Sequence, residues 1–243
     1  MSTQVVAVIL AGGVGNRFGH SEPKQFFKIH NKPVLYYSVK QFLDFLSSKK
    51  GRLIIVSPVD YMNQTNIFIK KYFEHFEKKI IVIPGGAERI DSYFKATDYI
   101  EKELPQTEVV IVHDGVRPLI KKNDILFLYQ KFIKSKVDVS FVGKSLNEGV
   151  FYRDKNNLRC VNREEFVSSQ TPFFYKFSTL KFLRAQYFSR KKKLHKNFHI
   201  LELIPQNTKK IKLTSFDIES PNTKLTTKHD IHFIKHALKS YEF

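Results

Sequence analysis

Cysteine, long apolar runs and acidic residues are all scarce in this sequence. Cys160 is the one cysteine among 243 residues, which excludes a disulfide within the chain and is typical of a reducing compartment. No apolar run approaches the roughly 18 residues that span a bilayer, and the N-terminus shows no basic segment followed by an apolar one. We therefore expect a soluble, cytoplasmic protein with no membrane contact, in which Cys160 is a small apolar filler.

The shortage of acidic residues leaves a basic chain, with 41 Lys and Arg against 23 Asp and Glu and a net charge of +18. Such a charge attracts nucleotides, sugar phosphates, nucleic acids or an anionic membrane face. The excess is mostly scattered lysine, and neither arginine-rich grooves with interleaved aromatics nor an RNA-binding signature is present. We expect mostly solvated basic surface and no nucleic-acid partner. A protein that binds nucleic acid or an acidic polymer is the alternative of another class.

Strands and helices are expected to alternate over the first 143 residues. The composition, 42% hydrophobic and 26% charged, is that of a globular chain. Alternation of this kind predicts an α/β fold, with a Rossmann-like, mainly parallel sheet and helices on both faces. We expect one domain over residues 1–243. Apolar runs predict strands at 5–13, 52–58, 79–86, 108–115 and 137–143, and helical spacing predicts helices at 32–48, 66–76, 90–103 and 123–135.

The pattern changes from Lys144 onward, where the strand-like segments become short and aromatic. We expect residues 144–161 to form a projecting β-arm. Two late strands are expected, at 211–217 and 222–227, before a last helix that begins near His229.

A glycine-rich stretch, "LAGGVGNRFGHSEPKQF" at residues 10–26, follows the first predicted strand. Glycines at a strand end let backbone N–H groups approach phosphate oxygens. The stretch is neither a dinucleotide fingerprint, since Phe18 stands at the closing position, nor a P-loop. Arg17 and Lys24 are either its phosphate-binding cations or solvated loop residues. The turns at 10–13, 84–86 and 113–115 should meet at one edge of the sheet, because ligands bind outside the carboxyl ends of parallel strands.

Five motifs resemble the cytidylyltransferases of the methylerythritol-phosphate and ribitol-phosphate type, which have the nucleotide-diphospho-sugar transferase fold. They are the glycine stretch with "PKQF", "GGAERIDS" at 85–92, "VHDGVRP" at 112–118, "VNREEF…SQTPFFY" at 161–175 and "NTKLTTKHD" at 222–230. The resemblance implies that CTP reacts with a polyol phosphate to give a CDP-polyol and pyrophosphate, with Mg²⁺ as cofactor. It also implies homodimers that form by exchange of the arms.

The same resemblance implies roles for particular residues. Arg17 and Lys24 would be catalytic and hold the α-phosphate region, and Asp114 would hold Mg²⁺ shared with the phosphates. Arg163 and Lys224 would orient the acceptor phosphate, Arg163 in the partner's site. The residues implied to bind the nucleotide are Leu10, Ala11, Gly12, Gly13, Gly85, Gly86, Ala87, Arg89, Asp91 and Ser92.

Two arginines keep open alternatives. Arg117 is expected either to position the substrate phosphate or to tie two loops together. Arg89 is expected to be either structural or functional. His113, beside Asp114, is expected to pack or to hydrogen-bond locally.

The chain departs from the family pattern in two places, "GKSLNEGV" at 143–150 and "HKNFHILELI" at 195–204. These departures leave the acceptor and the level of activity open. "LAGG" and "HDGVRP" look closer to the ribitol-phosphate branch, so our best guess for the acceptor is D-ribitol 5-phosphate. The alternative is 2-C-methyl-D-erythritol 4-phosphate.

Overall fold

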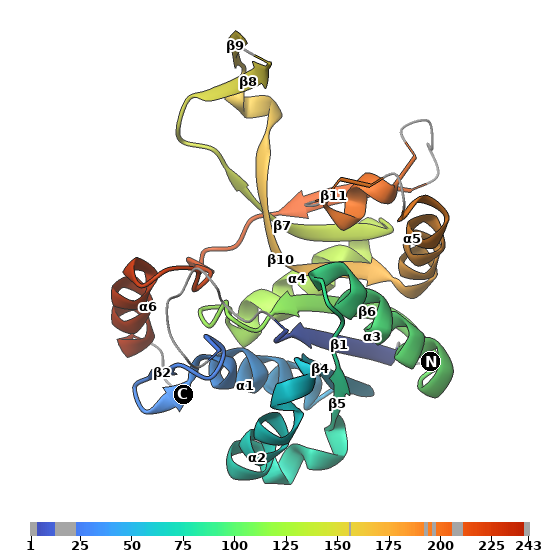
Figure 1. Cartoon of the computed structure of the whole chain (residues 1–243), viewed down its shortest axis with the longest axis vertical. Coiled ribbons are helices and arrows are strands. Elements are labelled where there is room, and N and C mark those ends of the chain that lie inside the picture. The colour runs from blue at the N-terminus through green and yellow to red at the C-terminus, as the bar shows by residue number, and fades with distance from the viewer. Residues whose placement is uncertain are drawn as a thin grey trace.

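A seven-stranded sheet forms the centre of the molecule (Figure 1). The computed structural model describes residues 4–12, 23–155, 157–191, 194–195, 198–205 and 211–240. The strands, in spatial order, are β11 (Leu213–Phe216), β7 (Val139–Ser145), β10 (Val167–Lys176), β6 (Thr107–Asp114), β1 (Gln4–Leu10), β4 (Gly51–Ser57) and β5 (Ile80–Pro84).

All the strands of this sheet run parallel except β10, which pairs antiparallel with both β6 and β7. The reversal follows from the connection between β7 and β10, because the chain leaves the sheet there and returns beside the strand that it left. Adjacent parallel strands elsewhere are joined through helices, as parallel pairing requires. The predicted Rossmann-like, mainly parallel α/β sheet is therefore confirmed.

Helices cover both faces of the sheet because alternate residues of each strand point to opposite sides. On β1, Val5, Ala7 and Ile9 belong to one buried cluster, and Val6, Val8 and Leu10 belong to the other. The first cluster packs against α1 (Val34–Leu46), α2 (Met62–Phe73), α4 (Lys122–Ser135) and α6 (His229–Lys239), and the second against α3 (Arg89–Glu103) and α5 (Phe177–Arg190).

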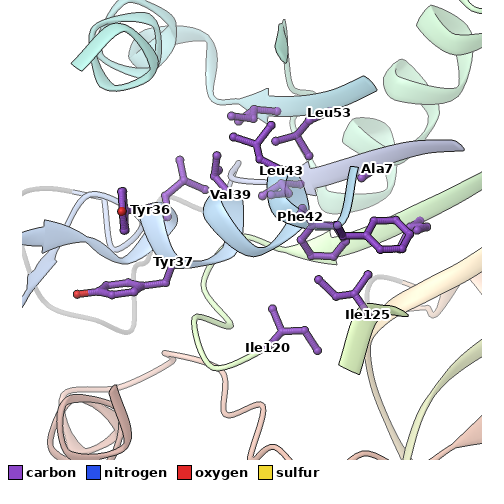
Figure 2. Packing of buried hydrophobic residues seen from close by; sticks show 14 of the residues in the cluster. Ala7, Tyr36, Tyr37, Val39, Phe42, Leu43, Leu53, Ile120 and Ile125 are labelled. Atoms are coloured by element: carbon purple, nitrogen blue, oxygen red, sulfur yellow. The ribbon is translucent and has the colours of Figure 1, made fainter. Parts of the chain in front are cut away.

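The first cluster shows how sequence spacing places α1 on the sheet. Val39, Phe42, Leu43 and Leu46 recur at helical spacing and are fully buried. Figure 2 shows Leu43 of α1 beside Leu53 of β4. Burying one such side chain contributes about 1.5–3 kcal/mol.

Short elements connect these layers. They are β2 (Lys28–Ile29), β3 (Lys32–Pro33), η1 (Val59–Tyr61), η2 (Glu74–Lys79), η3 (Arg163–Glu165) and η5 (Ile200–Leu203). None of the helices in the described ranges is both long and apolar enough to cross a membrane.

The predicted arm is confirmed as a hairpin of β8 (Val150–Asp154) and β9 (Asn157–Val161), which projects beyond β7 and β10 (Figure 1). Residues 144 and 145, which the prediction gave to the arm, still belong to β7. Cys160 lies on β9 and is exposed. Its predicted role as a small apolar filler is therefore wrong, because β8 and β9 project beyond the sheet and most of their residues are exposed.

Of the two predicted late strands, β11 matches the first, but residues 222–227 form no strand. Asn222 there adopts a positive φ of 45°. Its side-chain amide donates to the Gln170 side chain and to the Thr171 carbonyl. This segment crosses the strand ends instead of extending the sheet, and it carries Lys224 toward β6.

Candidate active site

Three strand ends meet at one cavity of about 220 Å³, as the topology predicts. The residues that line it are Leu10, Ala11, Gly12, Lys24, Gln25, Gly86, Ala87, Glu88, Arg89, Ser92, Asp114, Val116 and Lys224. A larger hollow of about 620 Å³ lies near the opposite ends of the strands, where Lys136, Lys176 and Lys181 line it. We place the site in the smaller cavity, because the glycine turns and Asp114 converge only there within the described part of the chain.

Asp114, the last residue of β6, is the centre of charge in this cavity. Its carboxylate lies 2.8 Å from the Arg89 guanidinium and 2.9 Å from the Lys224 ammonium. The Arg117 Nε lies 3.5 Å away. Burial alone would raise the pKa of this carboxyl, but the three cationic side chains outweigh it and hold the pKa of Asp114 well below its usual range.

Arg89 begins α3 and joins two of the strand-end turns. Its Nε and Nη2 both donate to one oxygen of Asp114, at 3.2 and 2.8 Å. Its guanidinium also lies over the Tyr93 ring, 5.0 Å from the centroid. The side chain therefore makes structural contacts and also lines the cavity, and a functional role for Arg89 stays a prediction.

Arg117 makes the contacts of a residue that ties two loops together. Its Nη1 donates to the Asn222 carbonyl at 2.8 Å. The side chain is buried, and burial lowers its pKa despite the nearby Asp114. It does not line the cavity among the described residues. The structure thus favours the loop-tying alternative, in which Arg117 holds the segment that carries Lys224.

His113 lies fully buried beneath Asp114 and hydrogen-bonds locally, as predicted. The Asp114 N–H donates to the Thr171 hydroxyl, which lies 3.2 Å from His113 Nδ1. His113 Nε2 lies 3.1 Å from the Arg117 carbonyl, so the proton must be on Nε2. Burial lowers the pKa of His113 to about 4, and the imidazole is neutral at pH 7.

Ser92 organises the second glycine turn. Its hydroxyl accepts from the Gly86 N–H at 3.1 Å and lies 3.3 Å from the Glu88 carbonyl. A Cβ on Gly86 would lie 2.2 Å from Asp91 Cβ, so only glycine fits this close approach. Lys95 Nζ donates to the Gly85 carbonyl at 2.8 Å. The turn is thereby held open toward the cavity.

Some predicted residues lie elsewhere. Gly85 and Asp91 do not line the cavity, and Asp91 instead forms a capping box with Glu88 at the start of α3. Arg163 is exposed in η3 at the base of the arm, where Nη1 donates to the Asn147 carbonyl at 2.6 Å. Gly13 and Arg17 lie outside the described residues.

Sequence reasoning missed Gln25, Glu88 and Val116 as cavity residues. Gln25 stands inside the quoted "PKQF" motif, and its place directly after Lys24 was the available signal. The segment 195–204, which departs from the family pattern, contains one acidic residue, Glu202. Its side chain accepts from the His199 N–H and lies 2.8 Å from His195. Glu202 therefore caps η5 and does not line the cavity.

The surroundings of Asp114 bear on the predicted magnesium site. No group of three or more His, Cys, Asp or Glu side chains could hold a metal ion in the ranges that the structure describes. Asp114 is one carboxylate, and both of its oxygens already accept from cationic side chains. This donor set does not fit a resident Mg²⁺, which needs oxygen ligands and repels nearby cations.

The cue that pointed to ribitol phosphate has a packing explanation. A Cβ on Gly115 would lie 2.8 Å from Leu35 Cδ1 and 3.0 Å from Ile9 Cγ2. Leu35 is fully buried. The glycine of "HDGVRP" thus has a packing reason that is independent of the acceptor.

Comparisons with known proteins favour the other acceptor. The model of the IspD family, 2-C-methyl-D-erythritol 4-phosphate cytidylyltransferase, matches residues 5–240. Proteins of that name from Thermosipho africanus and Endomicrobium trichonymphae are 30% and 31% identical to this chain over 236 residues. The matches cover 95% and 96% of this chain and 96% and 98% of those proteins. The ribitol 5-phosphate prediction receives no support from them.

Solved structures agree on the fold. A 4-diphosphocytidyl-2C-methyl-D-erythritol synthase from Anaerococcus prevotii superposes with a TM-score of 0.78 at 22% identity, covering 98% of this chain and 99% of the other. The Francisella tularensis IspD superposes with a TM-score of 0.71 at 23% identity, covering 98% and 100%. Together with the family model and the curated relatives, these findings show that the chain belongs to the 2-C-methyl-D-erythritol 4-phosphate cytidylyltransferase family, and it is a cytidylyltransferase.

Proposed function

We propose that this chain transfers the cytidylyl group of CTP to 2-C-methyl-D-erythritol 4-phosphate, giving 4-diphosphocytidyl-2-C-methyl-D-erythritol and pyrophosphate. The relatives at 30% and 31% identity carry the name of this acceptor. The observation that carries the proposal is the cavity itself. It brings Lys24, Lys224 and the two glycine turns together from distant parts of the chain, as a triphosphate site requires.

In this reaction an oxygen of the acceptor phosphate attacks the α-phosphorus of CTP, and the bond from that phosphorus to the bridging oxygen breaks. Pyrophosphate leaves with the electron pair, and no covalent enzyme intermediate forms. Lys24 and Arg17 would stabilise the charge that builds on the α-phosphate. Lys224 would exchange its contact with Asp114 for the acceptor phosphate, while Arg89 and Arg117 keep the carboxylate paired.

Mg²⁺ would enter with CTP as part of the substrate. The chemistry that the ion would supply is neutralisation of phosphate charge. Phosphate oxygens and water supply most ligands of such ions. Entry with CTP, rather than residence on Asp114, is supported by the two oxygens of Asp114, because both already accept from cationic side chains.

We further propose that the chain forms a homodimer through the arm. The hairpin and its base expose large apolar side chains, with exposed fractions of 58% for Phe151, 56% for Tyr152 and 60% for Leu158. By strand alternation Phe151 and Leu158 lie on one face of the hairpin and Tyr152 on the other, so both faces offer an apolar group to a partner. Arg163 stands beside them, outside the cavity of its own chain. In the dimer, Arg163 would reach the acceptor phosphate in the partner's site.

The acceptor is tested by mixing the purified protein with CTP, Mg²⁺ and either 2-C-methyl-D-erythritol 4-phosphate or D-ribitol 5-phosphate, and measuring pyrophosphate release. We expect release with the first acceptor at a kcat/KM at least about 100-fold above that with the second. Equal rates, or a preference for ribitol 5-phosphate, would contradict the proposed acceptor.

The dimer is tested by complementation between two inactive variants, Lys24→Ala and Arg163→Ala. If Arg163 serves the partner's site, a mixed dimer has one site with both residues intact. Equal mixing should therefore restore about a quarter of wild-type activity, because half of random dimers are mixed. A mixture as inactive as its components would place Arg163 in its own site or in none.

A further inference from the structure

Gln25 is a buried polar residue that joins two parts of the candidate site. Its side chain is 1% exposed, and its Nε2 donates to the Ala11 carbonyl at 2.6 Å. Both residues line the cavity. Burying an amide costs free energy unless it is hydrogen-bonded, and an apolar side chain would fill the same space without that cost. The hydrogen bond therefore needs an explanation beyond packing.

The residues around Gln25 form a turn that carries Lys24. The Phe26 N–H donates to the Pro23 carbonyl at 2.9 Å, and the Phe27 N–H donates to the Lys24 carbonyl at 3.3 Å. On one side, the backbone carbonyl of Gln25 accepts from the Leu35 N–H of α1 at 2.9 Å. This contact holds the turn against the start of the helix.

The other anchor of the turn is the end of β1. The Ala11 N–H donates to the Val56 carbonyl at 2.9 Å, and the Leu10 carbonyl accepts from the Gly115 N–H at 2.9 Å. The backbone that receives the Gln25 side chain is thus fixed to both neighbouring strands of the sheet. The side-chain hydrogen bond from Gln25 to Ala11 therefore ties the turn that carries Lys24 to the ends of the strands.

We propose that Gln25 is a positioning residue for the cytidylyl transfer, an inference that rests on the proposed function. It holds Lys24 at a set distance from the first glycine turn, so that the cation meets the α-phosphate of CTP in the transition state. A misplacement of about 1 Å can cost about 100-fold in rate. Acceptor binding depends on other elements, Lys224 among them, and does not use this hydrogen bond.

The test compares Gln25→Met with a matched control, Gln41→Met. Gln41 is also buried, at 9% exposure, and its Oε1 accepts from the Lys122 backbone N–H at 2.6 Å. It does not line the cavity. Each substitution removes one side-chain hydrogen bond to the backbone and keeps the volume. We expect Gln25→Met to lower kcat about 30-fold with the acceptor KM within about twofold, and Gln41→Met to keep wild-type kcat.

Amide hydrogen exchange provides a readout that does not need activity. In Gln25→Met the Phe26 and Phe27 amides should exchange about tenfold faster, while Gln41→Met leaves them unchanged. Gln25→Glu, which keeps the shape but not the donor when ionised, should show the same loss of kcat. It also replaces Gln25→Met if that variant fails to fold.

The outcomes separate this inference from the proposed function. An inactive wild-type enzyme overturns the proposed function, and with it the positioning role of Gln25, whatever the exchange rates show. An active wild type with Gln25→Met within threefold of its kcat overturns the positioning role alone. An equal loss of kcat in Gln41→Met would also overturn it, because the effect would then be one of general stability.

Discussion

Asp114 is one buried carboxylate that collects three cationic side chains from different parts of the fold. Removing a partner from a buried charge cluster leaves an uncompensated charge. Asp114 therefore keeps cations close together that would otherwise repel one another, before any phosphate enters. Arg89 and Lys224 are both partly exposed, at 44% and 36% of the side chain. Lys224 holds Asp114 through one hydrogen bond and Arg89 through two, so Lys224 can turn to a substrate at lower cost.

Lys224→Met should lower kcat/KM for the acceptor about 100-fold, because a charged contact to the reacting phosphate is lost. Arg89 and Arg117 still compensate the Asp114 carboxylate in this variant, and the lost pair is partly solvated, so the free energy of unfolding should change by less than about 1 kcal/mol. Steady-state kinetics and chemical denaturation check the two values. Lys228→Met, which removes an exposed lysine four residues later, is the control and should leave both unchanged. Comparable losses in the two variants would contradict the assignment.

His113 predicts a pH dependence of stability. Its pKa falls from 6.5 to about 4 on folding because the imidazole is buried. Between these values the unfolded chain binds a proton that the folded chain does not, so stability falls as the pH is lowered from 6.5 to 4. His113 alone should account for about 3 kcal/mol of that fall. His199, whose pKa burial also lowers, adds to it in the same direction.

Urea unfolding of His113→Asn over this pH range isolates the effect of His113. The slope of unfolding free energy against pH should become shallower by up to about 1.4 kcal/mol per unit. His75→Asn, at an exposed position in η2, should keep the wild-type slope. An unchanged slope in His113→Asn would mean that the ring is protonated in the folded state.

The elements of the sheet were predictable because each is a short pattern in the sequence. Helical and strand spacing placed the five early strands and four early helices, and topology placed their turns at one edge. Residues 222–227 were misassigned because three threonines flank Leu225 there, and threonine is common in strands. A buried Asn222 with positive φ overrides that local preference. Its partners lie some fifty residues away, beyond the reach of local pattern.

The second glycine turn predicts that alanine is harmful at Gly86 and tolerated at Gly149. Gly86→Ala would place a Cβ 2.2 Å from Asp91 Cβ, so the turn must shift, at a cost of about 1–3 kcal/mol. CTP affinity by calorimetry should fall at least about tenfold. Gly149→Ala, whose Cβ would meet only Phe151 at 3.6 Å, should change neither affinity nor thermal midpoint. Wild-type CTP affinity in Gly86→Ala would show that the nucleotide does not approach this turn.

The whole molecule carries a net charge of +18, while its substrates are anions. A field of this sign raises the encounter rate of anionic ligands and is screened by salt. At this scale the basic composition suits anionic, phosphate-bearing substrates such as CTP.

Salt should therefore act on substrate capture more than on chemistry. Raising sodium chloride from about 50 to 300 mM should lower kcat/KM for CTP about three- to tenfold and change kcat by less than about twofold. Sodium acetate at the same ionic strength is the control for specific chloride binding. A kcat/KM that is independent of both salts would contradict electrostatic steering.

The sequence by itself determined the layered α/β architecture, the meeting of three strand-end turns and the family resemblance, because these depend on residue spacing along the chain. Only the tertiary structure decided which cations reach Asp114, that Arg117 ties loops and that Gly115 serves packing. It also placed Gln25 on the Ala11 carbonyl. These facts depend on contacts between residues far apart in sequence, where side-chain reach and burial decide the pairing.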